Sequence, residues 1–433
     1  MDSIETRVMG KITKRLLPFL MACYFIAYLD RVNVSFAALT MNKDLAFTAT
    51  IFGWGSGIFF IGYFIFEVPS NIALEHFGAR RWIFRIMLSW GILSGAMAFI
   101  WDSTSFYVVR FLLGVAEAGF FPGIILFLTY WFPASYRARI VGYFMAAIPI
   151  SSIVGAPLSG SILGLDGVLG LRGWQWLFVL EAVPAVVMSF AVLAYLTDGP
   201  AKAHWLTAEE RDWLSGRLSL ERQSREAIVK FTLLQALAHP RVLLLSLVYF
   251  GIVATNYGMT FWLPQIIKGF GGLTNLETGF ITAIPYVAGA VAMVFWGLRS
   301  DRERERKWHV AIPIAIAAIG IALSAMTEDP VLKMSAVTLA GLGIFGVLPC
   351  FWTLPTALLT GTAAAGGIAL INSVGNIAGF VGPFAMGRIK DATGSFMFGL
   401  LFIAALAVLS FVVVLALGHN PALEGHAADS AAD

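Results

Sequence analysis

The apolar residues of this chain run in long stretches that are separated by short polar segments. About 20 apolar residues wound as an α-helix cross the hydrocarbon core of a bilayer. Twelve stretches fit this length, at residues 16–39, 51–74, 83–101, 104–128, 140–163, 174–196, 242–267, 278–298, 309–327, 331–350, 364–387 and 395–417. The pattern predicts an all-α integral membrane protein with twelve transmembrane helices.

The composition agrees with this prediction. Of 433 residues, 58% are hydrophobic and 13% are charged, whereas soluble proteins carry about 25% charged residues. A soluble enzyme, a nucleic-acid-binding module and a disordered chain are therefore excluded. Two cysteines, Cys23 and Cys350, cannot form a disulfide framework, and no His/Cys spacing indicates a metal site. We expect neither a metal nor another cofactor.

The basic residues predict the orientation. If the N-terminus is cytoplasmic, 21 Lys and Arg lie on the cytoplasmic side and 6 lie on the other side. Loops rich in Lys and Arg stay in the cytoplasm, so we expect both termini there. The basic N-terminus runs directly into a first span that is too long for a cleavable signal peptide.

One long polar segment, residues 198–241, divides the chain. Within it, Thr207 and Glu210 have the spacing of a helix capping box, which predicts a short amphipathic helix. We expect four parts: a six-helix bundle at 1–197, a cytoplasmic linker at 198–241, a second six-helix bundle at 242–418 and a disordered tail at 419–433.

The two bundles repeat each other. A shift of 226 residues places Glu75 on Asp301 and Trp82 on Trp308. Two related six-helix halves are typical of transporters that rock about a central binding site. We therefore expect pseudo-symmetric halves.

Charged residues recur in the repeated loops, where Glu75 and Arg81 correspond to a second group around Asp301 and Arg302. These charges either latch the halves together or only set the topology. The two loops resemble the signature of the major facilitator superfamily, Gly-x-x-x-Asp-Arg-x-Gly-Arg-Lys. The first copy departs from it, with Asn71 for the opening Gly and Glu for Asp. The resemblance implies the major facilitator fold.

Charges inside a bilayer are costly and usually functional. Those well inside the spans all lie in the first half, at Asp30, Arg31, Glu67, Arg110, Glu117 and Glu181. The planar guanidinium of an arginine suits a carboxylate. An anion that arrives at Arg31 would free a neighbouring acid to take a proton, which couples the two binding events. We expect two buried arginines balanced by two buried acids; the alternative is a set of fixed ion pairs that only orient helices.

Five segments sharpen the resemblance: Tyr28–Asn33, Arg110–Pro122, Gly173–Glu181, Asn256–Pro264 and Asn372–Asn376. They are similar to the anion:cation symporter family, and most of all to bacterial permeases for tartrate, sugar acids and aromatic acids. That family implies proton-coupled uptake of a small organic carboxylate across the inner membrane, by a protein that we expect to be a monomer.

The resemblance also implies roles for individual residues. It assigns the substrate to Arg31, Tyr28, Tyr63, Asn256, Tyr257, Asn372 and Asn376. It assigns proton coupling to Asp30 and Glu117, and a structural or gating role to Arg110. Trp262 either lines the cavity, where it would stack on an aromatic substrate, or packs in the interior.

Two other functions stay open, an exporter or exchanger of organic anions on the same fold and a membrane sensor that does not transport. In span 5, Gly155-Ala-Pro157 is only a remnant of the drug-antiporter signature, which favours uptake. An intramembrane enzyme is disfavoured because the spans hold no catalytic constellation.

Overall fold

The computed structural model describes residues 4–226, 239–303, 305–352, 354–355 and 362–417. The described part contains helices and no strand. The first half holds α1 (Ile4–Val32), α2 (Val34–Asp44), α3 (Ala49–Phe77), α4 (Ala79–Ala96), α5 (Ser103–Glu117), α6 (Phe120–Thr129), α7 (Ala134–Met145), α8 (Ala147–Ile162) and α9 (Gly173–Tyr195). After α10 (Ala208–Glu226), the second half holds α12 (Pro240–Lys268), α13 (Asn275–Glu303), α14 (Lys307–Ala325), α15 (Pro330–Phe351), α17 (Thr362–Thr393) and α18 (Met397–Ala416).

The predicted number of spans is confirmed. Eleven segments of the described chain are long and apolar enough to cross a membrane, and α17, with 32 residues, is a twelfth helix of membrane length. Three predicted spans, the first, fourth and fifth, are each built from two consecutive helices. At Asn33 and Ala146 the backbone keeps helical angles, so these spans are nearly continuous. The fourth is truly interrupted, because Gly119 between α5 and α6 has φ +82°.

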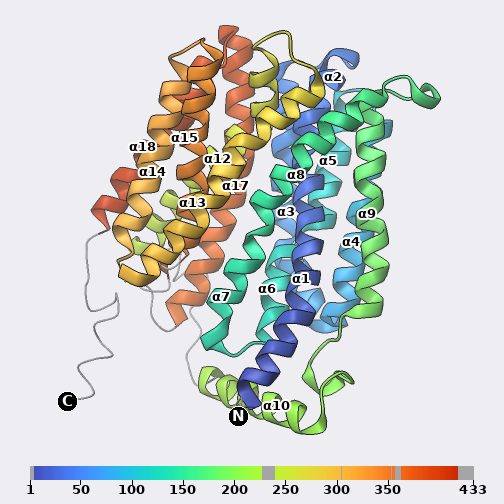
Figure 1. The fold of residues 1–433 in the computed structure, drawn as a ribbon, viewed down its shortest axis with the longest axis vertical. Helices are drawn as coiled ribbons and strands as arrows, with labels where there is room; N and C mark the ends of the chain where they lie inside the picture. The colour runs from blue at the N-terminus through green and yellow to red at the C-terminus, as the bar shows by residue number, and fades with distance from the viewer. Residues whose placement is uncertain (1–3, 227–238, 304, 353, 356–361, 418–433) are drawn as a thin grey trace.

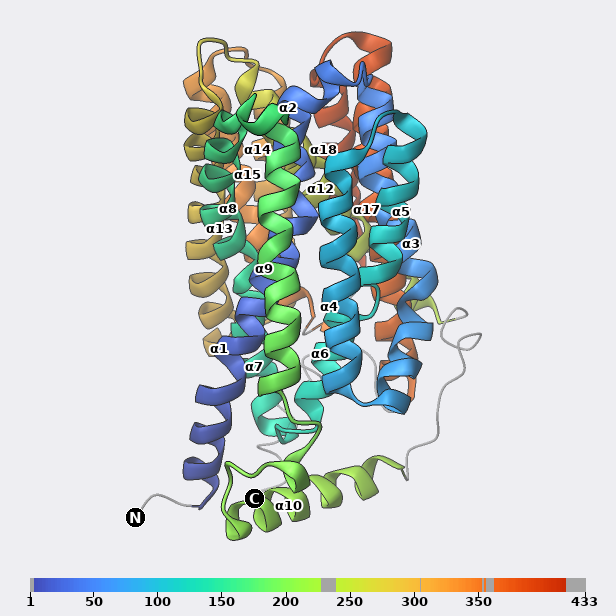
Figure 2. The ribbon, with the colours of Figure 1, turned by 90° about the vertical axis from the view of Figure 1, so that its right-hand side faces the viewer.

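The two halves meet along two pairs of helices, α3 with α17 and α8 with α13, which lie side by side in both views (Figures 1 and 2). Glycine permits the close approach: a Cβ at Gly53 of α3 would collide with the carbonyl oxygen of Pro383 on α17. A Cβ at Gly279 of α13 would collide with the carbonyl oxygen of Ala156 on α8 in the same way. Because Gly53 and Gly279 correspond under the shift of 226 residues, the two interfaces follow the sequence repeat.

The start of α3 is capped from the other half. The Asp391 carboxylate of α17 accepts hydrogen bonds from the backbone N–H groups of Ala49, at 3.1 Å, and Thr50, at 2.7 Å. A carboxylate at a helix N-terminus is stabilising because it meets unpaired N–H groups and the positive end of the helix dipole. The halves are thus joined at the end of the bundle away from α10.

The predicted amphipathic helix is α10, which lies across the end of the bundle where α1 begins (Figure 2). Its capping box is confirmed, since Thr207 and Glu210 exchange backbone-to-side-chain hydrogen bonds at 2.9 and 3.2 Å. The Lys11 ammonium contacts the Glu210 carboxylate at 2.6 Å and holds the pKa of Glu210 below its ordinary value. This contact fastens α10 to α1. Residues 227–238 of the linker and the predicted tail, 419–433, lie outside the described residues.

Candidate functional site

A buried ion pair joins α1 to α5. Arg31 lies at the end of α1, and its Nη2 pairs with the carboxylate of Glu117, which is the last residue of α5. Arg31 also donates from Nη1 to the Tyr257 hydroxyl of α12 at 3.0 Å. Arg31 is 7% exposed and Glu117 is 1% exposed. The guanidinium therefore joins an acid of its own half to a phenol of the other half, away from bulk water.

Aromatic rings surround this guanidinium. The Arg31 Cζ lies 5.4 Å from the ring centroid of Phe59, 5.6 Å from that of Tyr63 and 6.0 Å from that of Tyr28. Cations are attracted to the faces of aromatic rings, and more strongly where water is excluded. The structure thus brings two predicted substrate residues, Tyr28 and Tyr63, to the predicted anion-binding arginine.

The break in the fourth span positions Glu117. Helix α5 ends at Glu117, and the positive φ of Gly119 turns the chain into α6. Only glycine takes this conformation at low cost, and an added Cβ would collide with the Ser70 side chain. Discontinuous helices are a recurrent feature of ion and substrate sites in transporters, because freed polar groups meet at the break. The sequence reasoning missed this break.

Asp30 points away from the ion pair. Its carboxylate accepts hydrogen bonds from Trp90 Nε1 at 2.7 Å and from Ser94 Oγ at 3.1 Å, both on α4. Successive residues of a helix diverge by about 100°, which sends Asp30 toward α4 and Arg31 toward α5 and α12. Asp30 therefore lies beside the site without contacting Arg31, and its predicted proton role stays a prediction.

Arg110 is held by backbone carbonyls, and the structure shows no salt bridge for it among the described residues, so the expected balance of two arginines by two acids stays a prediction. Arg110 is fully buried, but its guanidinium donates to the backbone carbonyls of Gly55 and Ser56 on α3, each at 3.2 Å. Carbonyl oxygens inside a helix keep a second lone pair, so they can accept from a guanidinium without breaking the helix. Through these two hydrogen bonds Arg110 ties α5 to α3.

A second polar contact joins the halves near the ion pair. Both oxygens of the Glu67 carboxylate on α3 accept hydrogen bonds from α17, from Asn372 Nδ2 at 2.6 Å and from Asn376 Nδ2 at 2.8 Å. The two asparagines are predicted to bind substrate, and in this conformation they bind Glu67. Glu67 was not predicted to belong to the site, although a charged residue well inside a span indicates a functional role. Asn256, next to Tyr257 on α12, is 9% exposed.

The predicted latch residues lie at the loops between spans. Glu75, Arg81 and Arg302 are exposed, and the structure shows no ion pair for any of them among the described residues. Of Asp301 only the backbone, at the end of α13, is described. In the first loop it is Arg80 that is anchored, with Nε donating to the Leu193 carbonyl at 2.6 Å. The latch stays a prediction.

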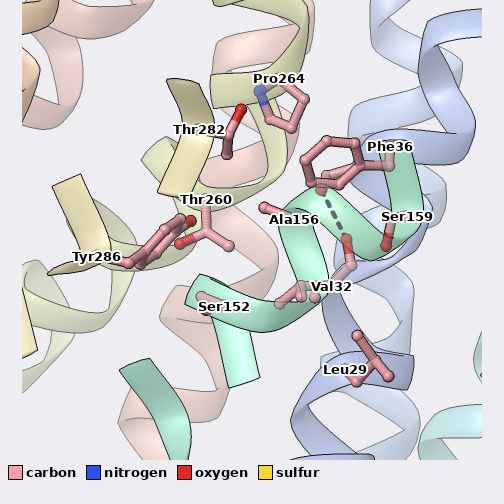
Figure 3. Close-up of a pocket in the computed structure, with 12 residues that line it drawn as sticks. Leu29, Val32, Phe36, Ser152, Ala156, Ser159, Thr260, Pro264, Thr282 and Tyr286 are labelled. Atoms are coloured by element: carbon pink, nitrogen blue, oxygen red, sulfur yellow. Dashed lines mark hydrogen bonds between the residues drawn. The ribbon is translucent and has the colours of Figure 1, made fainter. Parts of the chain in front are cut away.

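A small cavity of about 10 Å³ lies between the halves, with α8 of the first half on one side and α12 and α13 of the second half on the other (Figure 3). Hydroxyl groups from both halves line it, from Ser35, Ser152, Ser159, Thr260, Thr282 and Tyr286. The hydroxyl of Ser35 donates to the Val32 carbonyl at the end of α1, that of Thr282 to the Thr278 carbonyl of its own helix, and that of Ser159 to the Glu181 carboxylate. A cavity of this size holds about one water molecule. An organic acid does not fit there in this conformation.

The arrangement suits the binding of an anion. Arg31 is a permanent cation whose planar donors fit a carboxylate, and its present partner is a carboxylate of the protein. The described residues contain no group of acidic, histidine and cysteine side chains that could hold a metal ion. Trp262 is fully buried, packed against Phe52 and Phe396, so in this conformation it belongs to the interior.

Comparisons with known proteins identify the family of this chain. A family model described as "Major Facilitator Superfamily" matches residues 20–383. A protein of Agrobacterium vitis named "Putative tartrate transporter" is 52% identical over 419 residues, which cover 97% of this chain and 96% of that protein. The "Quinolone resistance transporter" of Acinetobacter baumannii is 42% identical over 409 residues, which cover 94% of each.

The fold is also similar to solved structures. The crystal structure of a bacterial homologue of the human lysosomal transporter Spinster, in an inward-facing and unoccupied conformation, aligns with a TM-score of 0.75. The alignment covers 94% of this chain and 98% of that one, at 16% sequence identity. At this identity the likeness supports the fold alone.

Proposed function

Because this chain belongs to the Major Facilitator Superfamily and is a multi-pass membrane transporter rather than an enzyme, we propose that it carries a small organic carboxylate together with a proton. The halves 1–197 and 242–418 would rock about Arg31 and expose it to each side of the membrane in turn. The buried pair of Arg31 and Glu117 is the observation that carries this proposal.

The coupling follows from this pair. A substrate carboxylate that binds Arg31 takes the place of the Glu117 carboxylate on the guanidinium. Glu117 is then a buried carboxylate without its cation, which is costly, so it takes up one proton from the outside. Substrate and proton are bound together and released together on the cytoplasmic side, where Glu117 loses its proton and returns to Arg31. Proton binding and anion binding thus stabilise each other.

A hydroxy or sugar acid, of which tartrate is the best candidate, is the substrate class that we propose. The relative named for tartrate, at 52% identity, supports this choice. So does the burial of Trp262, which leaves it unable to stack on an aromatic acid in this conformation. We also propose that the protein is a monomer in the bacterial inner membrane with both termini in the cytoplasm. Its transport would be driven by the proton gradient and would need no cofactor.

Uptake by proteoliposomes tests the function. We expect radiolabelled tartrate to accumulate when the outside is acidified and to stop accumulating when a protonophore is added. Arg31→Lys keeps the charge but loses the planar fork, and we expect it to abolish tartrate binding. Uptake that ignores the proton gradient would contradict the coupling, and tartrate binding by Arg31→Lys at the wild-type affinity would remove Arg31 from the site.

A second candidate is export of an organic molecule. It is favoured by the 42% identity to a protein named for quinolone resistance. Everted and right-side-out vesicles distinguish the two directions, since an exporter extrudes its substrate from the cytoplasmic side as protons enter. Outward movement of tartrate or of a quinolone under the same gradient supports the export function. Binding of tartrate without transport in either direction supports a sensor.

A further inference from the structure

Glu67 is the charged group through which α3 holds α17 near the site. It is 8% exposed, and each of its two carboxylate oxygens accepts a hydrogen bond from one asparagine amide of the other half. Asn372 and Asn376 are one helical turn apart, so their amides stand side by side on one face of α17. The pair of amides forms a two-pronged donor that matches a carboxylate.

The electrostatic situation of Glu67 differs from that of Glu117. Glu117 pairs with a guanidinium, whereas the described contacts of the Glu67 carboxylate are with neutral amides. A hydrogen bond with one charged partner is stronger than one between two neutral groups, but Glu67 has no cation among its described contacts to hold it in place. Another anionic or hydroxyl-rich group that reached the two amides would compete with the Glu67 carboxylate for the same N–H donors.

The amides are connected to the anion-binding arginine through α3. Glu67 follows Tyr63 by one turn of α3, so the two side chains share a face, and the Tyr63 ring centroid lies 5.6 Å from the Arg31 Cζ. A substrate carboxylate on Arg31 would thus have the two amides about one side chain away. A dicarboxylate or a polyhydroxy acid has a second polar end that can span such a distance, whereas a short monocarboxylate has none.

We infer that Glu67 is an internal substitute for the second polar end of the substrate. In the empty carrier its carboxylate occupies the two amides that would otherwise bind a distal carboxylate or hydroxyl group of an organic acid held on Arg31. Substrate binding displaces Glu67 from Asn372 and Asn376 and breaks this link between the halves. Binding at the amides and the link between α3 and α17 exclude each other, which couples occupancy to the relative position of the halves. This inference rests on the proposed function.

Binding affinity, measured by tryptophan fluorescence on the purified full-length protein, tests the inference with two probes. Tartrate carries a second hydroxyl and a second carboxylate at the end away from the first carboxylate, whereas that end of lactate is a methyl group. Glu67→Gln keeps the size of the side chain but removes the competing charge. We expect it to bind tartrate about tenfold more tightly than the wild type, with the affinity for lactate unchanged. Glu181→Gln is the matched control: it removes another buried glutamate of the same half, one that accepts from Ser159 of that half, and should leave the ratio of the two affinities unchanged.

A second variant acts on the other partner. Asn376→Leu removes one of the two amides, and we expect the preference for tartrate over lactate to fall at least fivefold. If Glu67→Gln does not fold, the tartrate preference of Asn376→Leu still tests the inference. Equal changes for tartrate and lactate, or weaker tartrate binding in Glu67→Gln, would overturn the inference while the proposed function stands. A wild-type protein that binds neither acid refutes the proposed function, and the inference with it.

Discussion

Arg31 and Tyr257 occupy equivalent positions in the two halves and are hydrogen-bonded to each other at 3.0 Å. They are 226 residues apart, which is the shift that superimposes the repeated loops. One half contributes the cation and the other half contributes, at the matching position, a neutral phenol that orients it.

Tyr257→Phe tests this relationship. The variant keeps the ring, which packs on Phe60 at a centroid distance of 4.5 Å, and removes only the hydroxyl. A hydrogen bond to a charged group is worth about 2 kcal/mol, so we expect the KM for uptake to rise at least tenfold with little change in thermal stability. Tyr195→Phe is the control, because that hydroxyl donates to the Arg15 carbonyl, far from Arg31 along α1. Equal KM values for wild type and Tyr257→Phe would show that the hydroxyl does not position Arg31.

Glu117→Gln separates binding from coupling. Glutamine keeps the size of the side chain but cannot carry the transported proton. We expect counterflow exchange of tartrate between two equally acidic compartments to continue, and gradient-driven accumulation to stop. Exchange and accumulation are measured on the same proteoliposome preparation, so a loss of both would instead indicate that Glu117 only holds Arg31 in place.

The sequence predicted what depends on local pattern. The spans follow from runs of apolar residues, and the capping box of Thr207 and Glu210 from a spacing of three residues. Arg31 was recognised because a charge in a bilayer demands a reason. Each of these signals is contained in a short stretch of chain.

What the sequence could not predict depends on contacts between distant residues. Glu67 meets Asn372 and Asn376 across more than 300 residues, and nothing local shows that a carboxylate will occupy amides that suit a substrate. The hydrogen bonds of Arg110 could not be predicted either, because only side-chain charges are visible in a sequence, whereas the carbonyls of Gly55 and Ser56 are backbone groups. Which groups a buried charged side chain contacts therefore depends on how distant helices pack against each other.

Arg110→Lys tests whether the hydrogen bonds of Arg110 to α3 stabilise the fold. Lysine keeps the charge, but its single ammonium cannot reach both carbonyls with the geometry of the fork. Losing at least one charged hydrogen bond in a fully buried position should lower the free energy of unfolding by about 2 kcal/mol. We expect a lower Tm in detergent and an unchanged tartrate affinity for the protein that remains folded. A tartrate affinity that falls while the Tm is unchanged would place Arg110 in the binding site instead.

Gly53→Ala tests the close approach of the halves. A Cβ at Gly53 would collide with the backbone carbonyl oxygen of Pro383, and backbone cannot move aside as a flexible side chain does. The added methyl should therefore push α17 away from α3 at the end where Asp391 caps α3, and slow the closing of that end. We expect transport to fall at least tenfold while tartrate binding is retained. Gly142→Ala is the matched control, because a Cβ there meets no atom within 4 Å, and its transport should equal that of the wild type. Gly279→Ala should behave like Gly53→Ala, since Gly279 faces the Ala156 carbonyl at the equivalent interface; normal transport by both variants would show that these contacts do not limit the cycle.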